Sequence, residues 1–144
     1  MKSRIINSGE QRTFVVVFDS GDEVIKGLSD FARGHQISAA EFAGIGALSD
    51  LVLGYFDWQQ KSYRRIPLAE QVEVVSLLGN IARGEDGAPT LHPHIIVAKS
   101  DGSAHGGHLL EAHVRPTLEI VVTESPAYLQ RRHDPQSGLA LIRL

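Results

Sequence analysis

Residues 13–34 read TFVVVFDSGDEVIKGLSDFARG, and this stretch contains both kinds of secondary structure that the chain is expected to form. The β-branched and aromatic run from Thr13 to Phe18 predicts a buried strand, which the turn residues Asp19-Ser-Gly21 would end. A helix is expected to follow directly, with Asp22 as its cap and Gly34 as its stop. Its apolar residues recur at helical spacing: Val24, Ile25, Leu28, Phe31 and Ala32.

Beyond this helix, short apolar runs are separated by turn residues, a pattern that is typical of strands. Strands are expected at residues 37–42, 48–57, 63–66, 71–82, 92–99, 108–114, 117–123 and 139–144. Gly44 and Gly46 separate the first two, and we interpret them as a structural turn because no third glycine completes a dinucleotide-binding fingerprint. Pro116 is expected to interrupt another pair. The sum is one helix near the start of a meandering, mainly antiparallel β domain.

The composition indicates one ordinary globular domain, residues 1–144. A domain of this length buries roughly 68–70% of its unfolded surface, so it needs no disulfide or metal merely to fold. The chain contains no cysteine, which excludes disulfides and thiolate ligands and suits the cytoplasm, its expected location. Residues 1–12 lack the apolar core of a signal peptide, and no apolar run is long enough to span a bilayer, so no membrane partner is expected.

The charge balance argues against a protein that binds nucleic acid by neutralising phosphates. The formal net charge is −3, whereas such proteins normally carry a concentrated basic surface. Adjacent basic residues occur in two doublets, Arg64-Arg65 and Arg131-Arg132. We interpret both doublets as solvated strand ends or hairpin tips.

The histidines are concentrated in one part of the chain: five of the seven fall between His92 and His113. Side chains two residues apart on a strand share a face, so His92 and His94 would project side by side. The polar step from Lys99 to Gly102 can turn the chain and bring a second strand back, with His108 beside the pair. His105 and His113 lie at odd separations from His108, so in a regular strand they would face the other side.

Three histidines on one face are typical of a catalytic zinc site, which commonly has three protein ligands and one exchangeable position. We therefore predict a divalent-metal site, with zinc as the expected ion, at His92, His94 and His108. The alternative is that these are ordinary histidines of a strand surface, the usual role of a histidine taken singly.

Several motifs in order resemble the plant-and-prokaryote-conserved (PPC) domain family. They are Gly44-Ile-Gly-Ala-Leu48, Glu73-Val-Val-Ser-Leu-Leu-Gly-Asn80, Leu91-His-Pro-His-Ile95, Asp101-Gly, Gly106-Gly-His-Leu109 and Thr117-Leu-Glu-Ile120. The resemblance spans nearly the whole chain and implies an α+β domain, built on a curved antiparallel sheet and assembled as a homotrimer. In plants the domain accompanies AT-hook DNA-binding motifs, and prokaryotic members are named as candidate DNA-binding proteins. This chain has no Arg-Gly-Arg-Pro hook.

A second resemblance covers only about one hairpin. The pattern His92-x-His94 followed by Gly106-Gly-His108 is similar to the zinc-binding stretch of acetolactate decarboxylase. It implies the same three ligands and leaves out His105 and His113. The enzyme's other catalytic residues find no counterparts here, so its activity is not implied.

Three functions therefore stay open. The first is a regulatory or DNA-associated protein that carries the metal site. The second is a metal-dependent enzyme of the lyase or hydrolase type that acts on a small molecule; Glu73, Glu111 and Glu119 are its candidate acids or bases, and Arg115 could hold an anionic substrate. The third is a structural site that joins strands or subunits, which would need a fourth ligand. No catalytic residue can be assigned from the sequence.

Overall fold

The computed structural model describes residues 1–7, 9, 11–125 and 129–143, and in them a mostly β protein with one helix. The elements in chain order are β1 (Lys2–Asn7), β2 (Thr13–Asp19), α1 (Val24–Gly34), β3 (Ala39–Asp57), β4 (Ser62–Leu68), β5 (Val72–Arg83), β6 (Pro89–Ala98), β7 (Ala104–Glu124), β8 (Gln130–His133) and β9 (Ala140–Arg143). The predicted mainly antiparallel sheet with one helix near the start is confirmed, although the helix is a small part of the α+β class that was expected.

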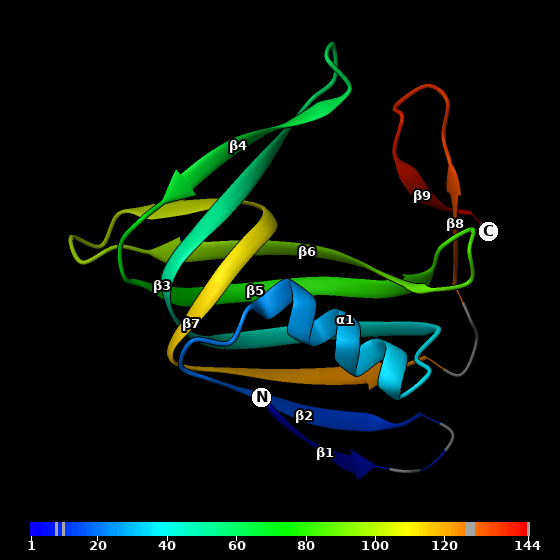
Figure 1. Ribbon diagram of the computed structural model, residues 1–144, viewed down its shortest axis with the longest axis horizontal. Helices are drawn as coiled ribbons and strands as arrows, with labels where there is room; N and C mark the ends of the chain where they lie inside the picture. Colours follow the sequence, from blue (N-terminus) through cyan, green and yellow to red (C-terminus); the bar gives the residue numbers. More distant parts are fainter. Residues whose placement is uncertain (8, 10, 126–128, 144) are drawn as a thin grey trace.

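The strands form one curved sheet with the order β1-β2-β7-β3-β5-β8-β9, in which β4 pairs with β3 and β6 pairs with both β5 and β7 (Figure 1). Every ladder is antiparallel except the contact between β5 and β8. Because β6 joins β5 to the start of β7, while β7 also pairs with β3, these four strands close a ring of ladders. The sheet curls around an apolar core as a result.

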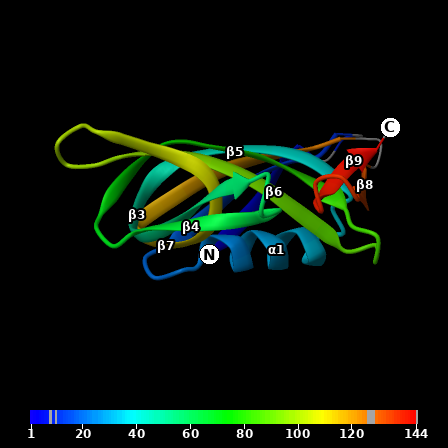
Figure 2. The ribbon, with the colours of Figure 1, turned by 90° about the horizontal axis from the view of Figure 1, so that it is seen from above.

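The helix packs on one side of this sheet against β6 and β7, as Figure 2 shows. Its apolar stripe is buried as predicted, with Val24, Leu28, Phe31 and Ala32 in the core. Its cap differs from the prediction. Glu23, not Asp22, accepts the hydrogen bond from the backbone N–H of Lys26. Asp22 instead accepts the backbone N–H of Asp19 at 2.9 Å, so it closes the preceding turn.

Two predicted interruptions do not break their strands. Gly44 and Gly46 lie inside β3, where the register with β5 shifts between them. A Cβ on Gly46 would lie 2.3 Å from the carbonyl oxygen of Thr117, so this close approach of β7 requires glycine. Pro116 lies inside β7, at a point where the ladder to β3 shifts register. Proline has no backbone N–H to donate, and at such an irregularity the ladder does not need one.

Two strands were not predicted, β1 at the sheet edge and β8 near the end of the chain. β8 adds to the end of β5 through Arg83 and Gln130 and forms a hairpin with β9. Among the described residues, no helix has both the length and the apolar character needed to cross a membrane.

Candidate metal centre

Neighbouring strands carry the three predicted histidines. His92 and His94 alternate with Pro93 along β6, and His94 is the direct register partner of His108 on β7. The turn at Lys99–Gly102 brings β7 back beside β6, and the amide of Gly102 donates to the carbonyl of Lys99 at 2.9 Å. The structure therefore brings His92, His94 and His108 together on one face of the sheet.

The three imidazoles form a compact triangle. One ring nitrogen from each lies within 4.8 Å of the other two, and the ring centroids are 5.0, 5.4 and 5.4 Å apart. The Nε2 atoms of His92 and His94 are 3.2 Å apart. Ligand nitrogens about 2.0–2.1 Å from a tetrahedral zinc ion would be separated by about 3.3 Å, so this pair already has the spacing of two zinc ligands.

The local environment favours the neutral form of two of the three imidazoles. Burial lowers the pKa of His108 to about 4, with further lowering from His92 and His94. Burial also lowers the pKa of His92, helped by the charge of Arg131 and by His94. Neutral imidazoles present the free lone pairs that metal binding requires. In addition, the buried Nδ1 of His108 has no hydrogen-bond partner among the described residues, an arrangement that costs free energy unless something else binds the ring.

An aromatic side chain from the neighbouring hairpin orients His108. The ring of Tyr63 on β4 stacks on the imidazole at 4.7 Å with an angle of 28°. Tyr63 is held in turn by an edge contact with Phe56 at 5.4 Å. Gly54 on β3 is the register partner of His108, and a Cβ there would be 2.8 Å from the Tyr63 ring. Glycine at this position allows the stack to form.

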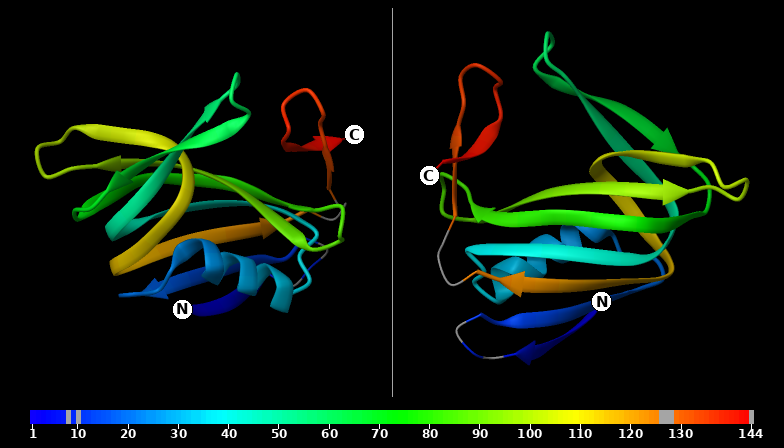
Figure 3. Two further views of the ribbon diagram at one scale, coloured as in Figure 1. Left: turned by 45° about the horizontal axis from the view of Figure 1, so that its top comes forward. Right: turned by 180° about the vertical axis from the view of Figure 1, so that it is seen from behind.

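A cavity of about 130 Å³ opens beside the histidines, between the sheet and the β8–β9 hairpin. It is lined by Tyr63, Thr90, Leu91, His92, His108, Arg131, Leu139, Ala140 and Leu141. The β3–β4 and β8–β9 hairpins rise on the same side of the sheet (Figure 3). Lys61 joins the two hairpins by donating to the carbonyl of Pro135 at 3.2 Å.

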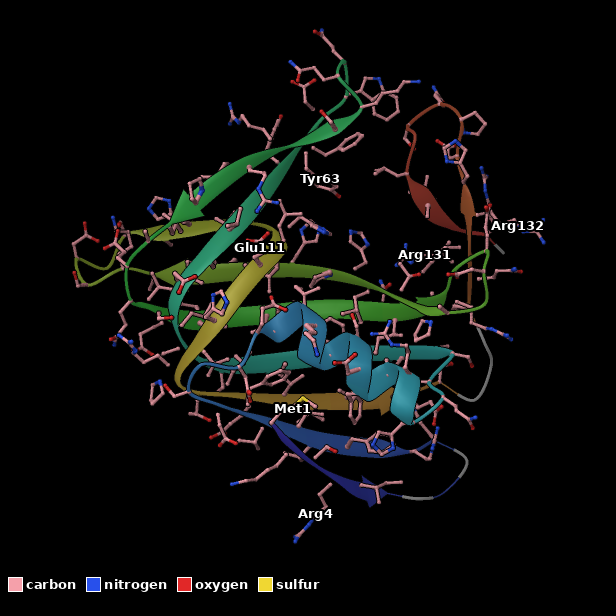
Figure 4. All side chains as sticks on the ribbon, viewed as in Figure 1. Met1, Arg4, Tyr63, Glu111, Arg131 and Arg132 are labelled. Atoms are coloured by element: carbon pink, nitrogen blue, oxygen red, sulfur yellow. The ribbon has the colours of Figure 1, made fainter. Side chains whose placement is uncertain are left out.

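Sequence reasoning missed the contribution of Arg131. The doublet Arg131-Arg132 was expected to be solvated, which is wrong for Arg131: it is 4% exposed, whereas Arg132 is exposed. The side chains of consecutive strand residues point to opposite faces, so one of the two must point inward once β8 exists. In Figure 4, Arg131 points from β8 toward the sheet and Arg132 points away. Recognising the Gln130–His133 segment as a strand could have found it.

The other histidines and the candidate acids lie elsewhere. His105 faces Val97 in the ladder, and the ring of His113 is hydrogen bonded to Asp50 at 2.8 Å, which raises the pKa of His113. Glu111 is exposed and pairs with Arg65 at 2.7 Å. Three further candidates are exposed and line none of the cavity beside the histidines: Glu73, Glu119 and Arg115. None of the four charged residues that were candidates from the sequence therefore lines this cavity.

The comparisons with known proteins agree with the fold and motifs. The model of the Plants and Prokaryotes Conserved domain matches residues 6–126, which confirms the family resemblance seen in the sequence. A metal-containing protein from Archaeoglobus fulgidus is 33% identical, with a TM-score of 0.84 over 92% of this chain and 93% of its own. A candidate DNA-binding protein from Bacteroides thetaiotaomicron is 30% identical, with a TM-score of 0.87 over 98% of this chain and 96% of its own. No curated protein matches the chain.

A more distant likeness extends to acetolactate decarboxylase. The enzyme from Bacillus subtilis subspecies spizizenii is 12% identical, with a TM-score of 0.54 over 77% of this chain and 52% of its own. At this identity the likeness is one of fold alone. This structural likeness covers 77% of the chain, whereas the sequence resemblance to the enzyme covers only about one hairpin.

Proposed function

The chain belongs to the Plants and Prokaryotes Conserved domain family, and within it we propose that His92, His94 and His108 bind a divalent metal ion, zinc, for chemistry on a small molecule. One observation carries the proposal: three imidazoles present ring nitrogens within 4.8 Å of one another beside a cavity. The description of the Archaeoglobus fulgidus relative as metal-containing supports it.

Three protein ligands favour a catalytic rather than a structural role. Structural zinc is normally closed by four protein ligands, and the described residues supply a cluster of three. A divalent ion with an open position acts as a Lewis acid toward a carbonyl or carboxylate oxygen. The chain's own residues would prepare the site: Tyr63 stacks on the His108 ring, and Leu91 and Leu139 give the cavity an apolar lining. We propose an enzyme of the lyase or hydrolase type.

Metal analysis of protein purified without a histidine tag tests the proposal. We expect close to one zinc per chain by mass spectrometry, and loss of that zinc in His108→Ala. His105→Ala is the matched control, because His105 lies on the same strand outside the cluster, and it should keep its metal. Protein that contains no metal and gains none from added zinc would refute the proposal.

We also propose a homotrimer, the assembly implied by the family resemblance. An apolar surface on the outer side of the sheet supports it, formed by Ile45, Val75, Leu78, Ile96 and Val121, which are 45–62% exposed. Four of them surround one shallow hollow of about 500 Å³. Exposed apolar patches of this kind mark protein interfaces. Light scattering of Val75→Glu should show a smaller species than the wild type, while Trp58→Lys, on the β3–β4 turn, should not change the mass.

DNA binding is the second candidate function, and the description of the Bacteroides thetaiotaomicron relative is the observation that favours it. The charges of this chain offer little support. The net charge is −3, Arg65 is paired with Glu111, and Arg131 is buried. A mobility-shift assay at low ionic strength decides the matter: salt-sensitive binding would support DNA association, and no shift would exclude it.

A further inference from the structure

The cavity beside the histidines contains a buried positive charge without a matching negative one. Arg131 is 4% exposed, and none of the salt bridges among the described residues includes it. Its guanidinium donates to the carbonyl of Ala140 at 3.1 Å and to the side-chain oxygen of Asn80, both uncharged acceptors. An unpaired buried charge is costly, so such a group is normally neutralised by a partner.

The guanidinium still has donors to offer. It carries five N–H groups, and the bonds to Ala140 and Asn80 use two of them. Its Nε–H is buried and has no acceptor among the described residues. The side chain is shielded from bulk solvent, since Arg131 is 4% exposed. Because Arg131 lines the cavity, an anion in this cavity can pair with its guanidinium.

Arg131 is the one charged group among the described residues that line the cavity, since burial lowers the pKa of the two histidines there. The lining contains Arg131 and two histidines of the cluster, and no aspartate or glutamate. A divalent ion on the histidines would add to this field, since neutral imidazoles do not reduce its charge. An anion that reached both the open metal position and the guanidinium would offset both charges.

The walls limit what kind of anion fits. Leu91, Leu139 and Leu141 are apolar, and Tyr63 adds an aromatic face. The volume of about 130 Å³ is well below the several hundred Å³ of a drug-sized ligand site. A nucleotide or a sugar phosphate is too large, and a fully hydrated inorganic anion would leave the apolar walls without a contact.

We propose that this cavity is the substrate site and that it binds a small aliphatic monocarboxylate, with Arg131 holding the carboxylate and the leucines its short apolar chain. The proposal rests on the proposed metal site for the chemistry that would follow binding. Figure 4 shows the arrangement, with Arg131 and Tyr63 directed toward the same space from the two hairpins. In this role Arg131 positions the substrate through charge-assisted hydrogen bonds.

The test is a titration of the full-length protein with propionate, using propionamide as the neutral isostere. The Arg131 Nε–H resonance, assigned by its absence in Arg131→Lys, should shift saturably with propionate and not with propionamide. Calorimetry on the zinc-loaded protein should show that Arg131→Gln weakens propionate binding by about 10- to 100-fold, the effect of losing a charged hydrogen-bond partner. Arg132→Gln is the matched control: it removes the same charge from the neighbouring residue, on the exposed side of β8, and should bind like the wild type.

Zinc content is measured in every sample, which separates this proposal from the proposed function. Zinc that binds while propionate and propionamide give equal responses would overturn the carboxylate site alone. Absence of zinc together with a propionate-specific shift would overturn the metal site and keep the carboxylate site. If Arg131→Gln does not fold, the comparison of propionate with propionamide on wild-type protein still decides the question.

Discussion

Acid should destabilise the metal-free protein through His108 in particular. Burial lowers the pKa of this imidazole from 6.5 to about 4 in the folded chain. The unfolded chain therefore binds a proton in the window between these values while the folded chain does not, and stability rises with pH there. The contribution is fully present above the unfolded pKa and is lost as the pH falls toward 4. From about pH 7.5 to about pH 5.0 the loss amounts to about 2 kcal/mol.

Urea denaturation with a chelator present, at these two pH values, measures the effect. The wild type should lose about 2 kcal/mol more than His108→Gln, whose side chain does not titrate. Comparing each protein with itself removes the packing cost of the substitution. His105→Gln, on the same strand outside the cluster, should retain the wild-type pH dependence. If His108→Gln and the wild type lost the same free energy on acidification, a neutral, half-buried His108 would be refuted.

Three further predictions concern the metal, the packing of the sheet and its surface. Zinc at about 100 times its dissociation constant should stabilise the protein by about 2.7 kcal/mol, visible as a rise of several degrees in Tm by calorimetry. Gly79→Ala should cost about 1–3 kcal/mol in urea denaturation, since its Cβ would lie 2.2 Å from the ring of Phe42; Gly34→Ala, with nothing within 4 Å, should not be destabilising. Asp50→Asn should lower the pKa of His113, because it weakens the hydrogen-bonded ion pair that raises this pKa; an NMR titration measures the shift, and an unchanged pKa would contradict the prediction. The same substitution should change the free energy of unfolding by less than about 1 kcal/mol, because both side chains are nearly half exposed.

The helix and most strands were predictable because their signals are local. The apolar stripe from Val24 to Ala32 has the helical period, and the β-branched and aromatic run from Thr13 to Phe18 is typical of a strand. The predicted strand boundaries were wrong where pairing with a distant strand continues through residues that usually end a strand. Gly46 and Pro116 look like interruptions in isolation, but β3 and β7 are paired along their length, and the bulges in their ladder absorb both residues.

The candidate site divides in the same way. His92 and His94 share a face because of the strand period alone, and one turn is enough to add His108. Tyr63 and Arg131 lie far from them in sequence and reach the site on separate hairpins. The candidate acids, which were chosen because they lie on neighbouring strands, do not line the cavity. Nearness in strand order does not specify the face of the sheet to which a side chain points. Glu111 illustrates this, being exposed and paired with Arg65.

The class of fold and the three clustered histidines could be predicted from the amino-acid sequence, because the residue period of a strand and a single turn are local features. The tertiary structure decided what surrounds those histidines. Only the closure of the ladders and the docking of the β8–β9 hairpin on β5 bury Arg131, because burial depends on segments that meet in space after folding. Arg131, which follows His92 and His94 by nearly forty residues in the sequence, thereby lines the same cavity as His92. Its unpaired charge is the reason for proposing that the cavity binds an anion.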